Sequence, residues 1–116
     1  MEYDANGPSA GPQGSATLRA MIRLSVLYPA GDDVTFDVDY YKTNHRDMCM
    51  KILGCERMEV DSPIAGPYVA AGHLYFPSME AFQAGTAHPD AAELQADVKN
   101  YTNATPVMQI SEVVEG

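Results

Sequence analysis

The order in which strand-like and helix-like hydrophobic patterns follow one another constrains this chain more than any other feature of its sequence. Four segments alternate at the two-residue period of a strand, some more regularly than others: Met21–Tyr28, Cys55–Asp61, Tyr68–Phe76 and Pro106–Val114. A helical period lies between the first and second of these segments, and another lies between the third and fourth. The predicted order of elements is therefore β-α-β-β-α-β.

The two helical segments carry recognisable start and stop residues. Thr35 is the predicted N-cap of the first helix, which is expected to end near Leu53, before Gly54. Ser78 is the predicted N-cap of the second, which His88-Pro89 interrupts before a further helical stretch at Ala91–Val98. The apolar face of the first helix is expected to comprise Val38, Tyr41, His45, Met48 and Ile52.

This order of elements is the ferredoxin-like arrangement, in which two helices cover one face of a four-stranded antiparallel sheet. The fold class is therefore α+β. A domain of this size is unlikely to leave the other face of its sheet in water, because exposed sheet faces of that extent mark association sites. The sequence therefore predicts a homodimer.

The first twenty residues differ in character from the rest. They are rich in glycine and proline and contain almost nothing to bury. They also lack the basic start and apolar stretch of a secretory signal. We expect residues 1–20 to be a flexible tail and residues 21–116 to form one domain.

Charge excludes two classes of partner. The chain of 116 residues has 7 Lys and Arg against 16 Asp and Glu, which gives a net charge of −9. Binding to nucleic acid requires a basic surface, and an anionic membrane surface would repel this chain. No apolar run approaches the roughly 20 residues of a membrane-spanning helix. A protein that handles small molecules or other proteins is the expectation.

The two cysteines, Cys49 and Cys55, have a spacing that fits neither a zinc site nor a redox motif. With a single possible bridge and no secretion signal, they are interpreted as reduced thiols in a cytoplasmic protein. Three histidines and many carboxylates supply metal-ligand types but no metal-binding spacing, so no metal site is predicted. His45 or His73 could ligate haem, but nothing else in the sequence indicates haem or any other cofactor.

His45 and His73 are the candidate catalytic residues. His45 lies on the apolar face of the first helix, where it could transfer protons near neutral pH; the alternative is a buried histidine that bonds a backbone carbonyl. His73 lies on the same strand face as Val69 and Tyr75. If that face meets the helices, the two histidines converge on one pocket; if it meets a partner subunit, His73 is structural.

Five further side chains are candidates for substrate binding. Arg23 and Gln109 are polar positions within strand patterns, where they either bond neighbours or line a wet cavity. An arginine can hold a carboxylate or an enolate at two points, although an ion pair with one of the acidic residues is the alternative. Tyr41, Tyr75 and Tyr101 could orient a phenolic or carbonyl substrate, although such spacing is also typical of core aromatics.

Four motifs in order give the sequence a family resemblance. They are an opening strand that ends in Val26-Leu-Tyr-Pro29, then Phe36 and Tyr40-Tyr41 with His45 four residues on, then His73 to Phe82, and last Asn100-Tyr-Thr-Asn before Pro106–Val113. Together they span Met21–Val113 and resemble the EthD family. The resemblance implies a dimeric α+β barrel, in which the sheets of two ferredoxin-like domains pack together. The family takes its name from the degradation of ethyl tert-butyl ether, where its members accompany an oxygenase system. Relatives with this barrel include cofactor-free monooxygenases, isomerases and cyclases.

Two functions follow as hypotheses. The first is a small EthD-like enzyme or enzyme accessory that acts on a hydrophobic organic molecule, with His45 transferring protons in an oxidation, isomerisation or dehydration. The second is a binding or carrier protein without catalysis, which holds a hydrophobic metabolite or a partner oxygenase. Fold alone does not choose between them.

Overall fold

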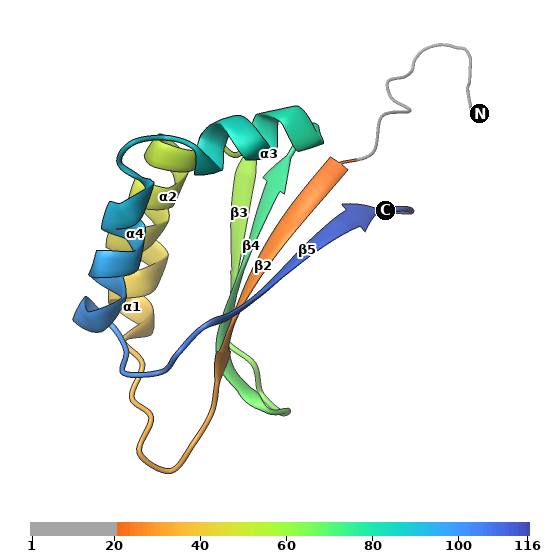
Figure 1. Ribbon diagram of the computed structural model, residues 1–116. Helices are drawn as coiled ribbons and strands as arrows, with labels where there is room; N and C mark the ends of the chain where they lie inside the picture. The colour runs from red at the N-terminus through yellow and green to blue at the C-terminus, as the bar shows by residue number, and fades with distance from the viewer. Residues whose placement is uncertain (1–20) are drawn as a thin grey trace.

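The computed structural model describes residues 21–116, and the tail predicted for residues 1–20 lies outside them. Four strands form one antiparallel sheet: β2 (Met21–Pro29), β3 (Arg57–Asp61), β4 (Tyr68–Phe76) and β5 (Val107–Val113). Their order across the sheet is β3-β4-β2-β5, with β4 and β2 in the centre (Figure 1). This is the ferredoxin-like order, and the predicted α+β fold is confirmed.

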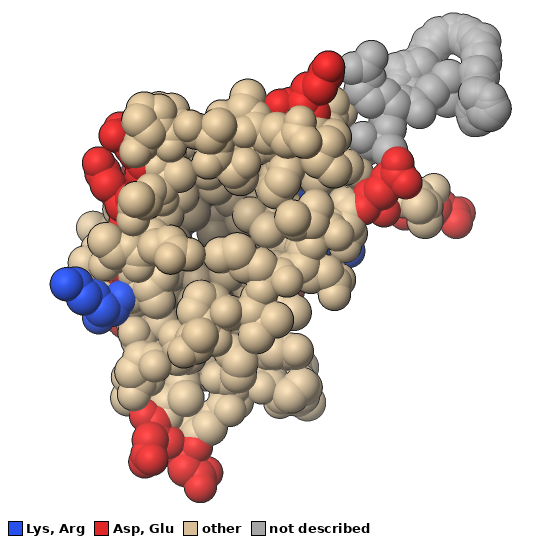
Figure 2. Space-filling view, in the orientation of Figure 1, with Lys and Arg blue, Asp and Glu red and all other residues tan. Residues whose placement is uncertain are grey.

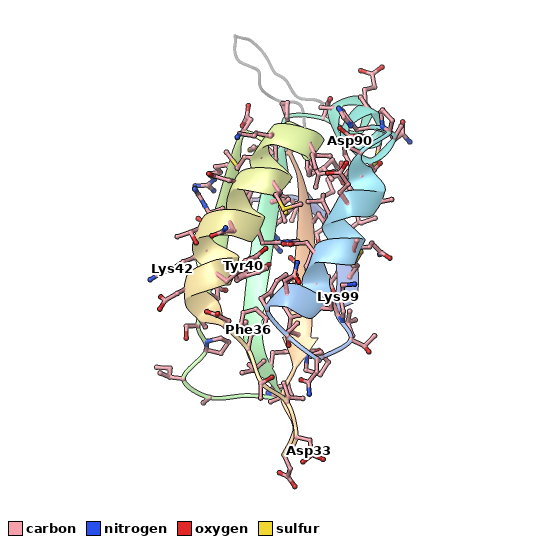
Figure 3. The ribbon with its side chains drawn as sticks, turned by 90° about the vertical axis from the view of Figure 1, so that its left-hand side faces the viewer. Asp33, Phe36, Tyr40, Lys42, Asp90 and Lys99 are labelled. Atoms are coloured by element: carbon pink, nitrogen blue, oxygen red, sulfur yellow. The ribbon has the colours of Figure 1, made fainter. Side chains whose placement is uncertain are left out.

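The helices occupy the two positions that the sequence predicts. The first region is continuous and comprises α1 (Val38–Tyr40), a π-helical turn η1 (Tyr41–His45) and α2 (Arg46–Leu53). The second comprises α3 (Met79–Thr86), α4 (Ala91–Asp97) and a 3₁₀ turn η2 (Val98–Asn100). Figure 3 shows α2 and α4 side by side in front of the sheet, so the helices cover one of its faces.

Local sequence explains most of the helix ends and corrects one of them. Ser78 accepts a hydrogen bond from the Ala81 backbone N–H, which confirms the predicted cap of α3. Gly54 ends α2 with φ +66°, a conformation in which a side chain would be strained. The prediction of Thr35 as the first N-cap is wrong. Asp37 caps the helix instead, by accepting from the Tyr40 N–H, because the chain at Thr35 is still held by a bond between its carbonyl and the Thr102 hydroxyl.

The π-helical turn changes which residues of the first helix are buried. A π turn holds more residues than an α turn, so buried positions recur here at intervals of four. The buried side chains are Tyr41, His45, Cys49 and Leu53. The prediction that Met48 lies on this face is therefore wrong: Met48 is only partly covered, and Cys49 takes the inward position.

The pairing of the strands divides the sheet side chains between two faces. Leu24 lies opposite Leu74 and Ile110, and all three point toward the helices. One residue further along, Ser25 lies opposite His73 and Gln109, which therefore point away from the helices. The helix-side face forms the hydrophobic core, whereas nothing in residues 21–116 covers the other, open face.

Candidate functional site

A small cavity lies between the helices and the sheet. Its volume is about 80 Å³, and its walls are mostly aliphatic side chains from β2, β4, α2 and α4. His45, Tyr41 and Tyr28 supply the polar groups at the inner part of this wall. The cavity thus combines an apolar lining with a few convergent polar atoms, which is the usual character of a small-molecule site.

His45 is held in this wall by a carboxylate from the other helix. Its Nδ1 lies 2.9 Å from Asp97 Oδ2, and both side chains are almost completely buried. Asp97 ends α4, and the π turn that ends at His45 faces it across the gap between the helices. Two segments that are 52 residues apart in the sequence therefore build this pair.

The second oxygen of Asp97 is also saturated. Asp97 Oδ1 accepts hydrogen bonds from the Tyr40 hydroxyl at 2.7 Å and from the Asn100 side-chain amide at 2.9 Å. Desolvation alone would raise the pKa of Asp97, but the hydrogen bonds from Asn100, His45 and Tyr40 outweigh it and hold the pKa below its usual range. The carboxyl group is therefore ionised at neutral pH.

The same surroundings keep His45 uncharged. Burial lowers the pKa of His45 below its usual value, and the nearby Asp97 only partly opposes this effect. Because an ionised carboxylate accepts hydrogen bonds and cannot donate them, the proton of the neutral ring is on Nδ1. Nε2 then carries the lone pair that a general base requires.

Tyrosines surround the Nε2 side of the ring. Tyr41 stacks on the imidazole at 5.4 Å between ring centroids, and the Tyr101 hydroxyl lies 3.4 Å from Nε2. That hydroxyl also bonds the Tyr28 hydroxyl at 2.6 Å. Burial raises the pKa of Tyr28, Tyr41 and Tyr101, so all three remain protonated donors. Of the three, Tyr28 and Tyr41 line the cavity, where their hydroxyls can bond an oxygen atom of a ligand.

Gly72 provides the room that Tyr41 requires. It lies in the middle of β4 on the helix-side face, opposite Val26. A Cβ at this position would clash with the Tyr41 hydroxyl. The absence of a side chain at Gly72 therefore positions the aromatic ring that stacks on His45.

The open face of the sheet carries the other predicted site residues. His73 Nδ1 lies 2.8 Å from Ser25 Oγ, and His73 Nε2 lies 2.9 Å from Asp61 Oδ2. Arg23, Tyr75 and Gln109 share this face. The strand register thus decides the alternative that the sequence left open: His73 and His45 lie on opposite sides of the sheet and do not share a pocket. Of the predicted site residues, the structure brings together His45, Tyr41 and Tyr101.

The described residues include two thiols but no group of metal-ligand side chains. Cys49 and Cys55 are buried free thiols, and burial raises the pKa of Cys49 to about 12. Within residues 21–116, no three side chains of His, Cys, Asp or Glu are grouped so that they could hold a metal ion. None of the helices in that range is long and apolar enough to cross a membrane.

Sequence reasoning missed Asp97, which is central to the site. Its only signal was its position: it lies three residues after Leu94, on the side of the helix that carries apolar residues. Tyr40 was noted only as part of a family motif, and Figure 3 shows it between the two helices. The roles of Asp97 and Tyr40 cannot be assigned from the sequence, because both depend on how closely α4 approaches the first helix in space.

The fold and the cavity define a class of protein: a ferredoxin-like α+β domain with an apolar cavity beneath its helices. Within this class the chain belongs to the EthD family, because the EthD domain profile matches residues 32–105. An EthD-like protein from Ralstonia eutropha JMP134 is 36% identical, with a TM-score of 0.76 over 84% of this chain and 95% of the other. No relative with curated annotation matches.

Two more distant structures share the fold alone. SnoaB from Streptomyces nogalater, a cofactor-independent oxygenase, is 8% identical with a TM-score of 0.59, over 84% of this chain and 95% of that one. A dimeric ferredoxin-like protein from Thermobifida fusca YX is 15% identical with a TM-score of 0.54, over 88% of this chain and 99% of that one. The similarity therefore extends to proteins with and without a stated activity.

Proposed function

We propose that this protein is a small EthD-type enzyme that removes a proton from a hydrophobic organic molecule, with His45 as the general base. One observation carries the proposal: a neutral, buried histidine lines an apolar cavity, with Nδ1 fixed by Asp97 and the lone pair on Nε2, where only a long contact of 3.4 Å from Tyr101 would have to yield to a substrate. Tyr28 and Tyr41, which line the cavity, would orient the substrate oxygen, and Tyr101 would hold Tyr28 and His45 in place. A cofactor-independent oxygenase shares this fold, so the fold can support catalysis without a cofactor.

Proton removal can be measured without knowledge of the final product. A thermal-shift screen of phenols, ketones and ethers first identifies compounds that raise the melting temperature. Those compounds are then incubated with the protein in D₂O, and NMR follows the incorporation of deuterium at carbon next to the carbonyl or ring oxygen. We expect His45→Gln to slow incorporation about 100-fold or more, since general bases contribute factors of this order.

His88 offers a matched control, because it is an exposed histidine in the α3–α4 connection and lies outside the cavity. His88→Gln should leave the exchange rate unchanged. Equal rates in the wild type and in folded His45→Gln would contradict the role of His45. Binding without any deuterium incorporation would favour the second candidate, a carrier or a partner of an oxygenase system, which the largely aliphatic wall of the cavity also supports.

We further propose that two copies associate through their open sheet faces, as in a dimeric α+β barrel. Arg23 supports this arrangement, because its Nε is buried without an acceptor in the described part of the chain. A buried N–H without a partner is costly, and a second copy would supply acceptors. His73, Tyr75 and Gln109 would then lie at this interface. Sedimentation at micromolar concentration should show a dimer, and a stable monomer would contradict the proposal.

A further inference from the structure

A wider trough lies beside the small cavity, along the edge of the sheet. This trough, which we call the β5 trough, has a volume of about 440 Å³ and is lined by residues that include Leu24, Thr86, Ala92 and Met108. The two hollows adjoin, because five residues line both: Leu24, Leu53, Leu94, Gln95 and Met108. Figure 2 shows the surface hollowed in this region, between α4 and β5.

Size shows that the cavity alone cannot hold a typical organic substrate. For comparison, an enclosed apolar cavity of about 150 Å³ binds one benzene molecule. The space next to His45 is about 80 Å³, so it accommodates one functional group and part of a ring. The remainder of any larger ligand must extend into the β5 trough.

The charge of the lining restricts the ligand further. Of the described residues that line the cavity and the trough, none is Lys, Arg, Asp or Glu. On the face that Figure 2 shows, the charged side chains lie at the rim. A carboxylate or phosphate inside would lose its hydration without gaining a cation, which is strongly unfavourable. Met108 and Ile110, both more than half exposed, instead offer apolar surface along β5.

We infer that the ligand is a neutral, elongated molecule with one polar end, which enters between α4 and β5, places that end beside His45 and lays an apolar tail along the β5 trough over Met108. This inference deepens the proposed function at the polar end, where it rests on the role of His45. The apolar tail depends only on the trough. An experiment can therefore contradict the position of the polar end without contradicting the position of the tail, and the reverse.

The test uses a series of probes that differ only in tail length and charge. Calorimetry measures the binding of phenol, para-butylphenol, para-octylphenol and para-octylbenzoate at neutral pH. We expect para-octylphenol to bind at least about tenfold more tightly than para-butylphenol, because each buried methylene increases affinity about two- to fourfold. We expect the anionic para-octylbenzoate to bind at least about tenfold more weakly than para-octylphenol.

Two exposed methionines provide a matched pair of variants. Met108 lies in the trough, and Met79, at the start of α3, lies outside it. Met108→Asp should reduce the advantage of the octyl over the butyl tail to less than about threefold; because Met108 also lines the cavity, this ratio of affinities is the readout, since both compounds share the same polar end. Met79→Asp should leave the whole series as in the wild type.

Each outcome has a distinct meaning. Equal affinity for the butyl and octyl compounds, or a tail effect that Met108→Asp does not alter, overturns the trough and leaves the role of His45 intact. Tail-dependent binding that is the same in the wild type and in His45→Gln contradicts the position of the polar end beside His45, whereas the proposed function is decided separately by the deuterium exchange of His45→Gln. Tighter binding of the benzoate overturns the neutral ligand. A smaller species for Met108→Asp in sedimentation would instead assign Met108 to contact between copies and overturn the trough.

Discussion

A histidine is bonded to an aspartate on each side of the sheet, between the helices on one side and on the strands of the open face on the other, and comparing the two pairs shows what burial does. The nitrogen and oxygen atoms are 2.9 Å apart in both. The side chains of His45 and Asp97 are 6% and 7% exposed, whereas those of His73 and Asp61 are 21% and 53% exposed. Burial makes the first pair a neutral base held by a fixed charge, and it leaves the second in contact with water in the single chain.

The largest expected difference between the two faces concerns the aspartates. Asp97→Asn should lower the free energy of unfolding by about 2–3 kcal/mol, because charge-assisted hydrogen bonds from three buried or partly buried groups are weakened. Asp61→Asn removes a half-exposed partner and should cost about 1 kcal/mol or less. Urea unfolding of both variants measures the difference. Equal losses of unfolding free energy would contradict the claim that burial strengthens the first pair.

Asp97 also has a positioning role that stability alone does not report. Asp97→Asn should slow deuterium exchange about 100-fold, since the amide no longer holds the proton on Nδ1. Asp61→Asn should change the rate less than twofold. A shift of the His45 ring toward the Nε2–H tautomer in Asp97→Asn, visible by ¹⁵N NMR, separates positioning from a general loss of structure. If the exchange rate of Asp97→Asn decreases only in proportion to the fraction of folded protein, Asp97 has no positioning role.

A smaller effect is expected at Gly72, which tests how closely the helix-side face is packed. Gly72→Ala should cost about 1–3 kcal/mol of unfolding free energy, because the new methyl group displaces the Tyr41 hydroxyl. The double variant Gly72→Ala with Tyr41→Phe removes that hydroxyl and should recover part of the loss. If the second change brings no recovery in urea unfolding, the contact with Tyr41 does not account for the glycine.

The smallest expected effect is the pH dependence that His45 confers. Burial lowers its pKa in the folded state, so the unfolded chain binds the proton more readily. The stabilising contribution is therefore complete above about pH 6.5 and is lost as pH falls through the folded pKa. The free energy of unfolding should decrease between pH 7 and pH 5, and less so in His45→Gln. Identical pH profiles would show that His45 is not the group responsible.

The fold was predictable because its determinants are local and repeated. The alternation in Tyr68–Phe76 and the caps at Ser78 and Gly54 each specify their element without tertiary information. Thr35 and Met48 were misassigned because long-range contacts decided both. The bond from the Thr102 hydroxyl holds the chain at Thr35 in an extended conformation, and a π turn that no propensity indicates shifts the buried face to Cys49.

The site was predictable only in part. His45, Tyr41 and Tyr101 were found because a polar or aromatic residue on an apolar face stands out in the sequence. Asp97 did not stand out, because its role depends on the approach of two helices that are distant in the sequence. The face of His73 could not be chosen either, since alternation groups residues without saying which group meets the helices.

The most direct test of the account is a ¹⁵N NMR titration of the imidazole rings in the full chain. We expect His45 to be neutral at pH 7, to carry its proton on Nδ1 and to have a pKa below its usual value of 6.5. A ring that is charged at pH 7, or that carries its proton on Nε2, would contradict the central claim, because Nε2 would then have no lone pair with which to accept a substrate proton.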